Sequence, residues 1–328
     1  MKKINILPFR EFWQDCFNCI VYSMTKYAFD VPKLYYYNNM YTYKITEEAV
    51  VENGKRISYM SATPWTDNFR LIDEITTNRE LQWWEDEKDI IGYIKKNLDN
   101  DRIVLAGIDL YYWIQEGLHY HHNHIDHYSL IIGYDDEKEE MIVLETGDDM
   151  FAEFRVGYDD VKEAVSHCDM PTRTSDINWD AKVTMFSKED LVYYAGDIIN
   201  SIQELEERKH DFWNVNEISN DGLYEVLSIL QTHIFSMQNR ASIDSYMFKN
   251  AFKSDVIDGI SLSETLTGIA REFEKLKGSC IKHLYRENRK PGIQALKDRT
   301  FELLEKNKNI WQLFVEKNYQ IEMKESFD

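Results

Sequence analysis

The chain has 328 residues, of which 43% are hydrophobic and 14% aromatic, enough to build one large or two ordinary domains. Its net charge of -20 disfavours binding to nucleic acid or to an anionic membrane surface, because both are polyanions. No segment has the pattern of an export signal or the roughly 18 apolar residues that cross a membrane, so we expect a cytoplasmic protein whose cysteines are free thiols.

The first half of the chain predicts a mixture of helices and strands. Apolar residues three to four apart predict a buried helix over 16–29, with Asp15 in the N-cap position. A second helix is expected over 81–98. The next segment, 102–110, is apolar, β-branched and too short for an ordinary helix, which favours a central strand.

Two further strands are expected at residues 128–134 (YSLIIGY) and 141–145 (MIVLE). The segment between them, 135–140, is charged, as is typical of a hairpin loop. These strands predict an antiparallel sheet, so residues 1–185 are expected to form an α+β domain.

After Ser187 the β-rich composition ends and amphipathic patterns predict helices over 187–211, 221–252, 262–285 and 293–318. Ser187 followed by Asp190 is typical of a capping box, and Pro291 stands just before the last helix. Residues 186–328 are therefore predicted to form an all-α domain.

A cysteine at a helix start and a histidine at a strand start are the residues most suited to catalysis. Cys16 is expected at the positive end of its helix, which favours the thiolate that acts as a nucleophile. His127 directly precedes the first hairpin strand, and Glu145 ends the second, where its carboxylate can orient the imidazole. Cys19, one turn beyond Cys16, is expected to be a packed thiol. A lone cysteine in an apolar helix is more often a core residue, so the prediction depends on neighbouring motifs.

The neighbouring motifs are QDCFNCIVYSMTKY (14–27) and GIDLYYWIQEGLHYHHNHIDHYSLIIGYDDEKEEMIVLE (107–145). The second contains an H-x5-G-Y-D-D hairpin similar to that of bacteriocin-processing papain-like cysteine peptidases, formed by His127, Gly133, Tyr134, Asp135 and Asp136. With the D-x-Y-Y element Asp109, Tyr111 and Tyr112, the first half of the chain resembles the N-terminal domain of the butirosin biosynthesis protein H family. That group also contains the amide-forming enzyme of closthioamide assembly.

The resemblance implies a papain-like fold and an acyl-transfer reaction. The family takes acyl groups from the phosphopantetheine thioester of an acyl or peptidyl carrier protein and passes them to an amine acceptor in antibiotic biosynthesis, without a cofactor of its own. By the same resemblance Cys16 is the nucleophile and His127 the base. The third position usually holds an aspartate, whereas this chain has Glu145, so Asp148 and Asp149 stay open as alternatives.

Three further residues are candidates for oxyanion or substrate binding. Gln14 lies two residues before Cys16 and is our candidate for the side-chain donor to an oxyanion. Asp109 stands at a strand end, where it either binds the substrate amine or fixes the following loop. Tyr111 belongs to the same element.

A histidine-rich segment gives the appearance of a metal site, with His119, His121, His122, His124 and His127 close in sequence. No cysteine accompanies them, and their spacing lacks the helical H-E-x-x-H context of zinc enzymes. We therefore predict no metal site.

A basic run in this acidic chain comprises Lys282, His283, Arg286, Arg289 and Lys290. It is either a solvated helix end or a docking patch for a carrier protein, because carrier proteins are strongly acidic.

Two other functions are compatible with the same residues. A papain-like peptidase or thioesterase would share the chemistry up to the acyl-enzyme and differ only in donor and acceptor. A non-catalytic carrier-binding protein is expected if Glu145 fails to orient His127.

Overall fold

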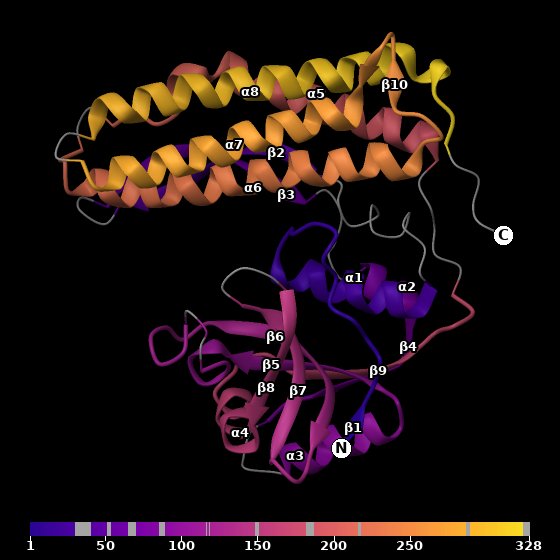
Figure 1. The fold of residues 1–328 in the computed structure, drawn as a ribbon. Helices are drawn as coiled ribbons and strands as arrows, with labels where there is room; N and C mark the ends of the chain where they lie inside the picture. The colour runs from indigo at the N-terminus through magenta and orange to yellow at the C-terminus, as the bar shows by residue number, and fades with distance from the viewer. Residues whose placement is uncertain are drawn as a thin grey trace. The chain divides into compact units, whose positions relative to one another are not determined.

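The computed structural model describes residues 1–29, 41–50, 54–64, 70–84, 89–115, 117, 119–147, 151–181, 187–215, 218–286 and 289–323. The chain is mixed α/β, with an antiparallel sheet and a helical C-terminal region (Figure 1). It divides into two compact units, one built from residues 1–35 and 68–184 and the other from 36–67 and 185–328. The sequence predicted two contiguous domains, whereas here residues 36–67 belong to the helical unit.

The sheet unit is built on strands in the order β4-β9-β5-β6-β7-β8. Every pairing in it is antiparallel, and the short β1 pairs with β6 beside this path. The strands are β1 (Lys2–Lys3), β4 (Thr76–Gln82), β5 (Ile103–Asp109), β6 (Asp126–Asp135), β7 (Glu140–Thr146), β8 (Phe151–Gly157) and β9 (Thr172–Ile177).

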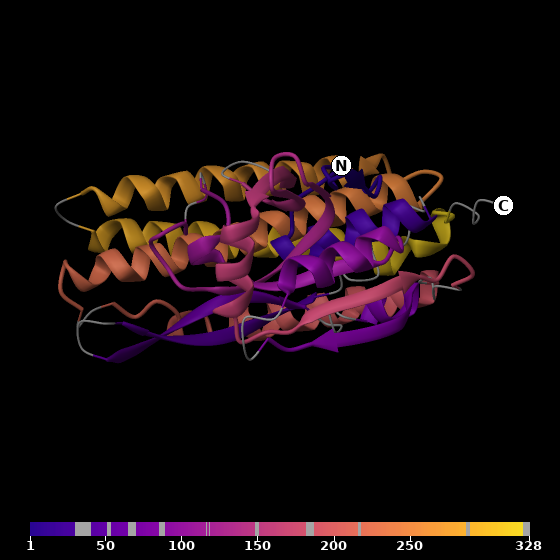
Figure 2. The same ribbon diagram turned by 90° about the horizontal axis from the view of Figure 1, so that it is seen from below.

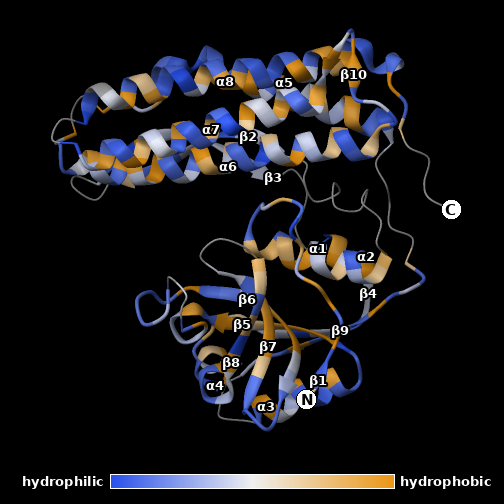
Figure 3. Ribbon diagram, viewed as in Figure 1, coloured by the Kyte–Doolittle hydropathy of each residue, from blue (hydrophilic) through white to orange (hydrophobic). Residues whose placement is uncertain are grey.

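The centre of the sheet is buried on both faces. β5 is buried at every position and β7 at all but its end residues, so helices must cover each face. α1 (Cys16–Phe29) and α2 (Arg70–Ile75) lie on one side, and α3 (Ile90–Asp99) and α4 (Tyr158–Ser166) lie on the other (Figure 1). The apolar colouring of α1 and of the central strands agrees with this core (Figure 3).

Most of the elements predicted in the sheet unit are confirmed. α1 has the predicted bounds, and Asp15 Oδ1 accepts a hydrogen bond from the Asn18 backbone N–H at 2.7 Å, as an N-cap should. The strand at β5 and the β6–β7 hairpin are also confirmed. The helix predicted over 81–98 is wrong in its first part, because residues up to Gln82 pair with β9 and the helix starts only after Asp89, which caps Gly92.

The G-Y segment of the hairpin motif has a structural role. A Cβ atom at Gly133 would lie 2.4 Å from the Lys2 carbonyl oxygen, so glycine allows β1 to approach β6. The Tyr134 hydroxyl donates to Asp99 Oδ1 at 2.7 Å and so joins β6 to the end of α3. These contacts hold the hairpin that carries His127.

The helical unit contains the four helices that the sequence predicted: α5 (Lys188–Glu207), α6 (Gly222–Ala251), α7 (Leu262–Leu284) and α8 (Lys290–Lys317). The capping box of Ser187 and Asp190 is confirmed, and Pro291 lies in the first turn of α8. A short hairpin, β10 (Val256–Ile257) and β11 (Ile260–Ser261), joins α6 to α7. No helix in the described ranges has the length and apolarity needed to cross a membrane.

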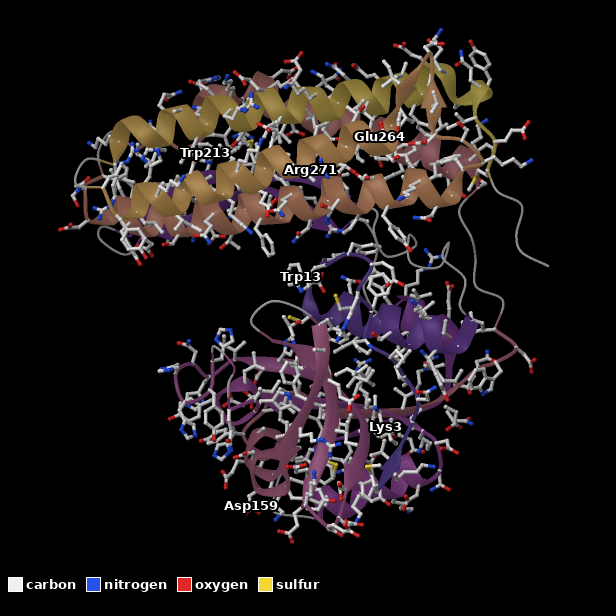
Figure 4. The ribbon with its side chains drawn as sticks, viewed as in Figure 1. Lys3, Trp13, Asp159, Trp213, Glu264 and Arg271 are labelled. Atoms are coloured by element: carbon white, nitrogen blue, oxygen red, sulfur yellow. The ribbon has the colours of Figure 1, made fainter. Side chains whose placement is uncertain are left out.

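A long hairpin that the sequence did not predict packs against these helices. It consists of β2 (Tyr41–Val50) and β3 (Lys55–Pro64), which contact α5 and α6 respectively and run alongside them (Figure 2). The segment after α5 is tied to it, since the Trp213 backbone N–H donates to the Ser58 carbonyl at 3.2 Å (Trp213 is labelled in Figure 4). The hairpin therefore belongs to the core of this unit.

A buried hydrogen bond joins Tyr41 of this hairpin to the Asp244 carboxyl of α6. The Tyr41 hydroxyl donates to Asp244 Oδ2 at 2.7 Å, and both residues are almost fully buried. Burial raises the pKa of Asp244 to about 7, although the Tyr41 hydrogen bond and the charge of Arg240 oppose the rise. Asp244 is thus held partly protonated near neutral pH.

This buried carboxyl predicts a pH dependence of stability. Folded Asp244 keeps its proton up to about pH 7, whereas the unfolded residue loses it near its ordinary pKa of about 3.9. The free energy of unfolding should therefore fall by about 1 kcal/mol between about pH 5.5 and about pH 6.5 from this group, and level off above its folded pKa. Denaturant unfolding of Asp244→Asn should show a shallower pH slope than wild type. An unchanged slope would contradict this assignment.

Candidate active site

The register of the β6–β7 hairpin brings His127 and Glu145 to one face of the sheet. Leu130 pairs with Leu144, and continuing this antiparallel register by one residue would set Ser129 opposite Glu145. His127 is two residues before Ser129, which places it on the same face and one diagonal step from Glu145. The two side chains meet there, with His127 Nε2 at 3.3 Å from Glu145 Oε1.

Cys16 reaches this face from α1, which packs on β6 and β7. It is the first residue of the helix and is partly exposed. Its Sγ, one ring nitrogen of His127 and one carboxylate oxygen of Glu145 lie within 4.8 Å of one another. The structure thus brings together the three residues that the sequence predicted as the triad.

The His127 imidazole is largely buried, and its pKa is raised. Its side chain is 19% exposed, and that of Glu145 only 3%. Burial by itself lowers the pKa of His127, but contacts with Cys16 and Glu145 and their negative charge outweigh it, and the pKa rises to about 10. The raised pKa keeps the imidazole of His127 protonated beside the Cys16 sulfur at neutral pH.

The carboxylate of Glu145 is itself held in place. Its Oε1 accepts a hydrogen bond from the Thr146 backbone N–H at 2.8 Å. Its Oε2 and His127 Nε2 are buried and have no well-aligned hydrogen-bond partner. Catalytic hydrogen bonds are often loose before substrate binds, so this arrangement is compatible with a working site. The alternatives Asp148 and Asp149 lie outside the described residues.

The other cysteines are poor nucleophiles by comparison. Cys19 is fully buried, and burial raises its pKa to about 12. Burial likewise raises the pKa of Cys168 and of Cys280 to about 12 each. All four cysteines are free thiols, as predicted, and Cys16 lines a cavity.

That cavity has a volume of about 400 Å³ and lies within the sheet unit. Cys16, His127 and Glu145 form one part of its wall. The loop between β5 and β6 and the end of β7 form the rest, with Leu110, Trp113, Ile114, Gly117, His119, Tyr120, Thr146 and Gly147. Sequence reasoning did not assign these wall residues to the site, although it did name His119 as part of the histidine-rich segment.

Asp109 fixes this loop. It is 2% exposed, and its Oδ1 accepts hydrogen bonds from the backbone N–H groups of Tyr111 at 3.0 Å and Ile125 at 3.1 Å. Its Oδ2 contacts His124 Nδ1 at 2.6 Å, and His124 stacks on the Tyr111 ring. Of the two roles that the sequence left open for Asp109, these contacts favour loop fixation. Neither Asp109 nor Tyr111 is among the cavity wall residues.

Gln14 is also engaged inside the protein. It is 6% exposed, and its Oε1 accepts a hydrogen bond from the Tyr22 hydroxyl at 2.6 Å. Gln14 is not among the cavity wall residues, so its role as an oxyanion donor stays a prediction.

The histidine-rich loop does not converge on one point. Within the described ranges, the only group of three side chains spaced to share a metal ion is Cys16, His127 and Glu145. Sulfur, nitrogen and oxygen donors suit zinc, and the three ligand atoms lie within 4.8 Å of one another. The three residues that could share an ion are thus the same three that the sequence predicted as the triad.

The predicted basic patch is only partly available for docking. Lys282, Arg286 and Lys290 are exposed around the turn from α7 to α8. Arg289 instead donates to the Leu284 carbonyl through Nε and Nη2, and to the Asn220 carbonyl through Nη1 at 2.7 Å. Arg289 thus satisfies a carbonyl at the C-terminal end of α7, a role in keeping the turn together.

The electrostatics of the site predict selective alkylation. Iodoacetamide at about pH 6.5 should label Cys16 at least about tenfold faster than the other three cysteines, because the thiolate is the reacting form. His127→Gln should slow Cys16 labelling by about tenfold, whereas His122→Gln, a change at an exposed loop histidine, should leave it unchanged. Peptide mapping by mass spectrometry measures both. Equal rates in wild type and His127→Gln would contradict the pairing.

Comparison with known proteins does not assign the chain to a family. No protein-family model and no curated protein matches it. The resemblance to the butirosin biosynthesis protein H family therefore stays a prediction, and the function has to be argued from the residues of the site.

Proposed function

We propose that the chain is a cysteine acyltransferase of papain-like fold that forms amides from carrier-bound thioesters. One observation carries the proposal: a partly exposed cysteine at a helix start lines a cavity and lies within 4.8 Å of a partly buried histidine and a buried glutamate. Nucleophile, base and orienting carboxylate within reach of one another are the signature of covalent acyl chemistry.

The first half of the reaction loads the enzyme. The Cys16 thiolate attacks the thioester carbonyl, a new S–C bond forms, and the C–S bond to the pantetheine thiol breaks. The leaving thiolate takes the proton from the His127 imidazolium. The products are an acyl-Cys16 thioester, neutral His127 and a free pantetheine thiol. Exchange of one thioester for another is nearly neutral in free energy, so the protein mainly has to position the reactants.

The second half transfers the acyl group to an amine. Neutral His127 takes a proton from the attacking amine, the N–C bond forms and the S–C bond to Cys16 breaks. The amide leaves, and the thiolate and imidazolium are restored. Glu145 keeps the imidazole oriented in both halves and stabilises its positive charge.

The cavity favours transfer of a compact group over cleavage of an extended peptide. Its volume of about 400 Å³ is in the range of small-molecule sites. Its partly apolar wall helps to keep water from competing with the amine. We place the enzyme in the cytoplasm, where reducing conditions keep its thiols free.

Loss of the nucleophile is expected to abolish the acyl-enzyme. Cys16→Ala should form no adduct with a butyryl N-acetylcysteamine thioester, while Cys19→Ala, one turn along α1, should still form it. His127→Ala should slow adduct formation by about 100-fold, as removal of a general base usually does. Intact mass measured after rapid quenching follows the adduct. An adduct retained in Cys16→Ala and lost in Cys19→Ala would show that the nucleophile is misassigned.

A chelator and a peptide substrate complete this test. EDTA should leave adduct formation unchanged, whereas a loss that zinc restores would favour a metal centre at the same three residues. Efficient cleavage of peptides, with indifference to thioesters, would favour a peptidase. An adduct that forms and decays only by hydrolysis with every amine offered would favour a thioesterase.

Docking of an acidic carrier protein is expected to use the exposed part of the basic patch. Reversing Lys282 and Arg286 to Glu should raise KM for a carrier-bound donor several-fold and weaken its salt dependence, because rim charges act mainly on association. Turnover of an N-acetylcysteamine thioester should stay near wild type.

The matched control reverses Lys249 and Lys306, two exposed lysines of α6 and α8 outside the patch. The control should leave both substrates unaffected. Equal effects of the two double variants on the carrier-bound donor would mean that net charge, and not this patch, matters. Arg289 is not suitable for the test, because its reversal would break the turn between α7 and α8.

A further inference from the structure

The cavity beside Cys16 has an apolar wall that the proposed reaction does not itself require. Leu110, Trp113, Ile114 and Tyr120 supply it, all from the segment that follows β5. Trp113 is 1% exposed and Ile114 7%, so their side chains face the protein interior or the cavity and not bulk solvent. A group attached to the Cys16 sulfur would lie beside this wall.

The wall is held in place before any substrate arrives. The Trp113 indole N–H donates to Ser129 Oγ at 3.2 Å, and its backbone N–H donates to the Leu110 carbonyl at 3.3 Å. Ser129 lies on β6 two residues from His127, on the same face of the sheet. Asp109 anchors both ends of the loop through Tyr111 and Ile125, as described above. A wall fixed in this way can select between acyl groups, because it does not rearrange to fit each one.

Outside the catalytic group of Cys16, His127 and Glu145, the described wall has no carboxylate, lysine or arginine that could pair with a charge on the acyl group. The ionisable wall residues are Cys16, His127 and Glu145, which form the catalytic group, together with Tyr120 and with His119, whose Nδ1 lies 3.4 Å from Asn123 Nδ2. An ammonium or carboxylate on the acyl chain would lose water without gaining a counter-ion, which is costly. An uncharged chain would instead gain from burial against the apolar wall.

On the basis of the proposed function, we propose that this pocket selects an uncharged, largely apolar acyl group, and that Ile114 is a specificity-determining residue. Each methylene buried in the pocket should raise kcat/KM for acylation of Cys16 by about fourfold, until the pocket is full. The chemical class of donor is therefore an aliphatic or aromatic acyl thioester. An amino-acyl or dicarboxylic thioester should be a poor donor.

The test compares donors of equal shape and different charge. N-acetylcysteamine thioesters of acetyl, butyryl and pentanoyl groups establish the chain-length trend on the wild-type protein. The 4-aminobutyryl thioester matches pentanoyl in shape but carries an ammonium, and the succinyl thioester matches 4-methylpentanoyl but carries a carboxylate. Initial rates of adduct formation on Cys16 are measured by intact mass. Each charged donor should react at least about tenfold more slowly than its uncharged match.

A pair of variants then locates the selectivity. Ile114→Asp should slow pentanoyl transfer to Cys16 by at least about tenfold and bring the 4-aminobutyryl rate close to it, because the new carboxylate pairs with the ammonium. His122→Asp places the same charge on the same loop at an exposed position outside the described cavity wall, and should leave the wild-type preference intact. The acetyl thioester and the melting temperature serve as checks that each variant is folded.

The outcomes separate the two proposals. If thioesters acylate Cys16 but charged donors react as fast as their uncharged matches, the apolar pocket proposal is overturned and the acyltransferase stands. If no thioester of the series acylates Cys16, both are overturned. Should Ile114→Asp fail to fold, the wild-type series by itself still decides the pocket proposal, and Ile114→Ala, with a reduced chain-length trend expected, decides the role of Ile114.

Discussion

The pairing register of β6 and β7 is the constraint on which the site depends. A shift of one residue would turn Glu145 to the opposite face of the sheet from His127 and leave the imidazole without its carboxylate. The contacts that fix the register lie away from the chemistry, at Gly133, where β1 crosses close to β6, and at Tyr134, which bonds to α3. Gly133 and Tyr134 of the G-Y-D-D motif thus support the site by fixing the position of the β6–β7 hairpin.

The position of these strands also explains how His127 and Glu145 can form a charged pair inside the protein. A buried glutamate by itself would be costly, and a buried histidine would lose its proton. When His127, Glu145 and the sulfur of Cys16 lie together, the attraction between their charges offsets the cost of burying each one. The Thr146 backbone N–H adds a hydrogen bond to the Glu145 carboxylate. Placing the sulfur at the first residue of α1 adds the positive end of the helix. The sulfur therefore lies beside two fixed features of the fold, the start of a helix and the His127 imidazolium.

Local signals in the sequence were sufficient for the elements that position the triad, and insufficient for the rest. The helix at Cys16, the hairpin and the four long helices carry strong periodicity or clear caps. β4 and β9 are polar and short, and their pairing is a long-range contact that no local pattern encodes. The β2–β3 hairpin does show alternation, with Tyr41 and Tyr43 inward, but only tertiary packing assigns it to the helical unit. The cavity wall is a loop, whose path local propensity does not determine.

The central claim is that His127 is held as an imidazolium between Cys16 and Glu145, and a direct titration of that ring tests it. Histidine labelled with ¹⁵N would be followed by NMR from neutral to alkaline pH in wild type and in Cys16→Ala. The account predicts that the His127 ring titrates near its raised pKa of about 10 in wild type and at a clearly lower pH in the variant. Titration near its ordinary value of about 6.5 in wild type, or the same pKa in both proteins, would contradict it.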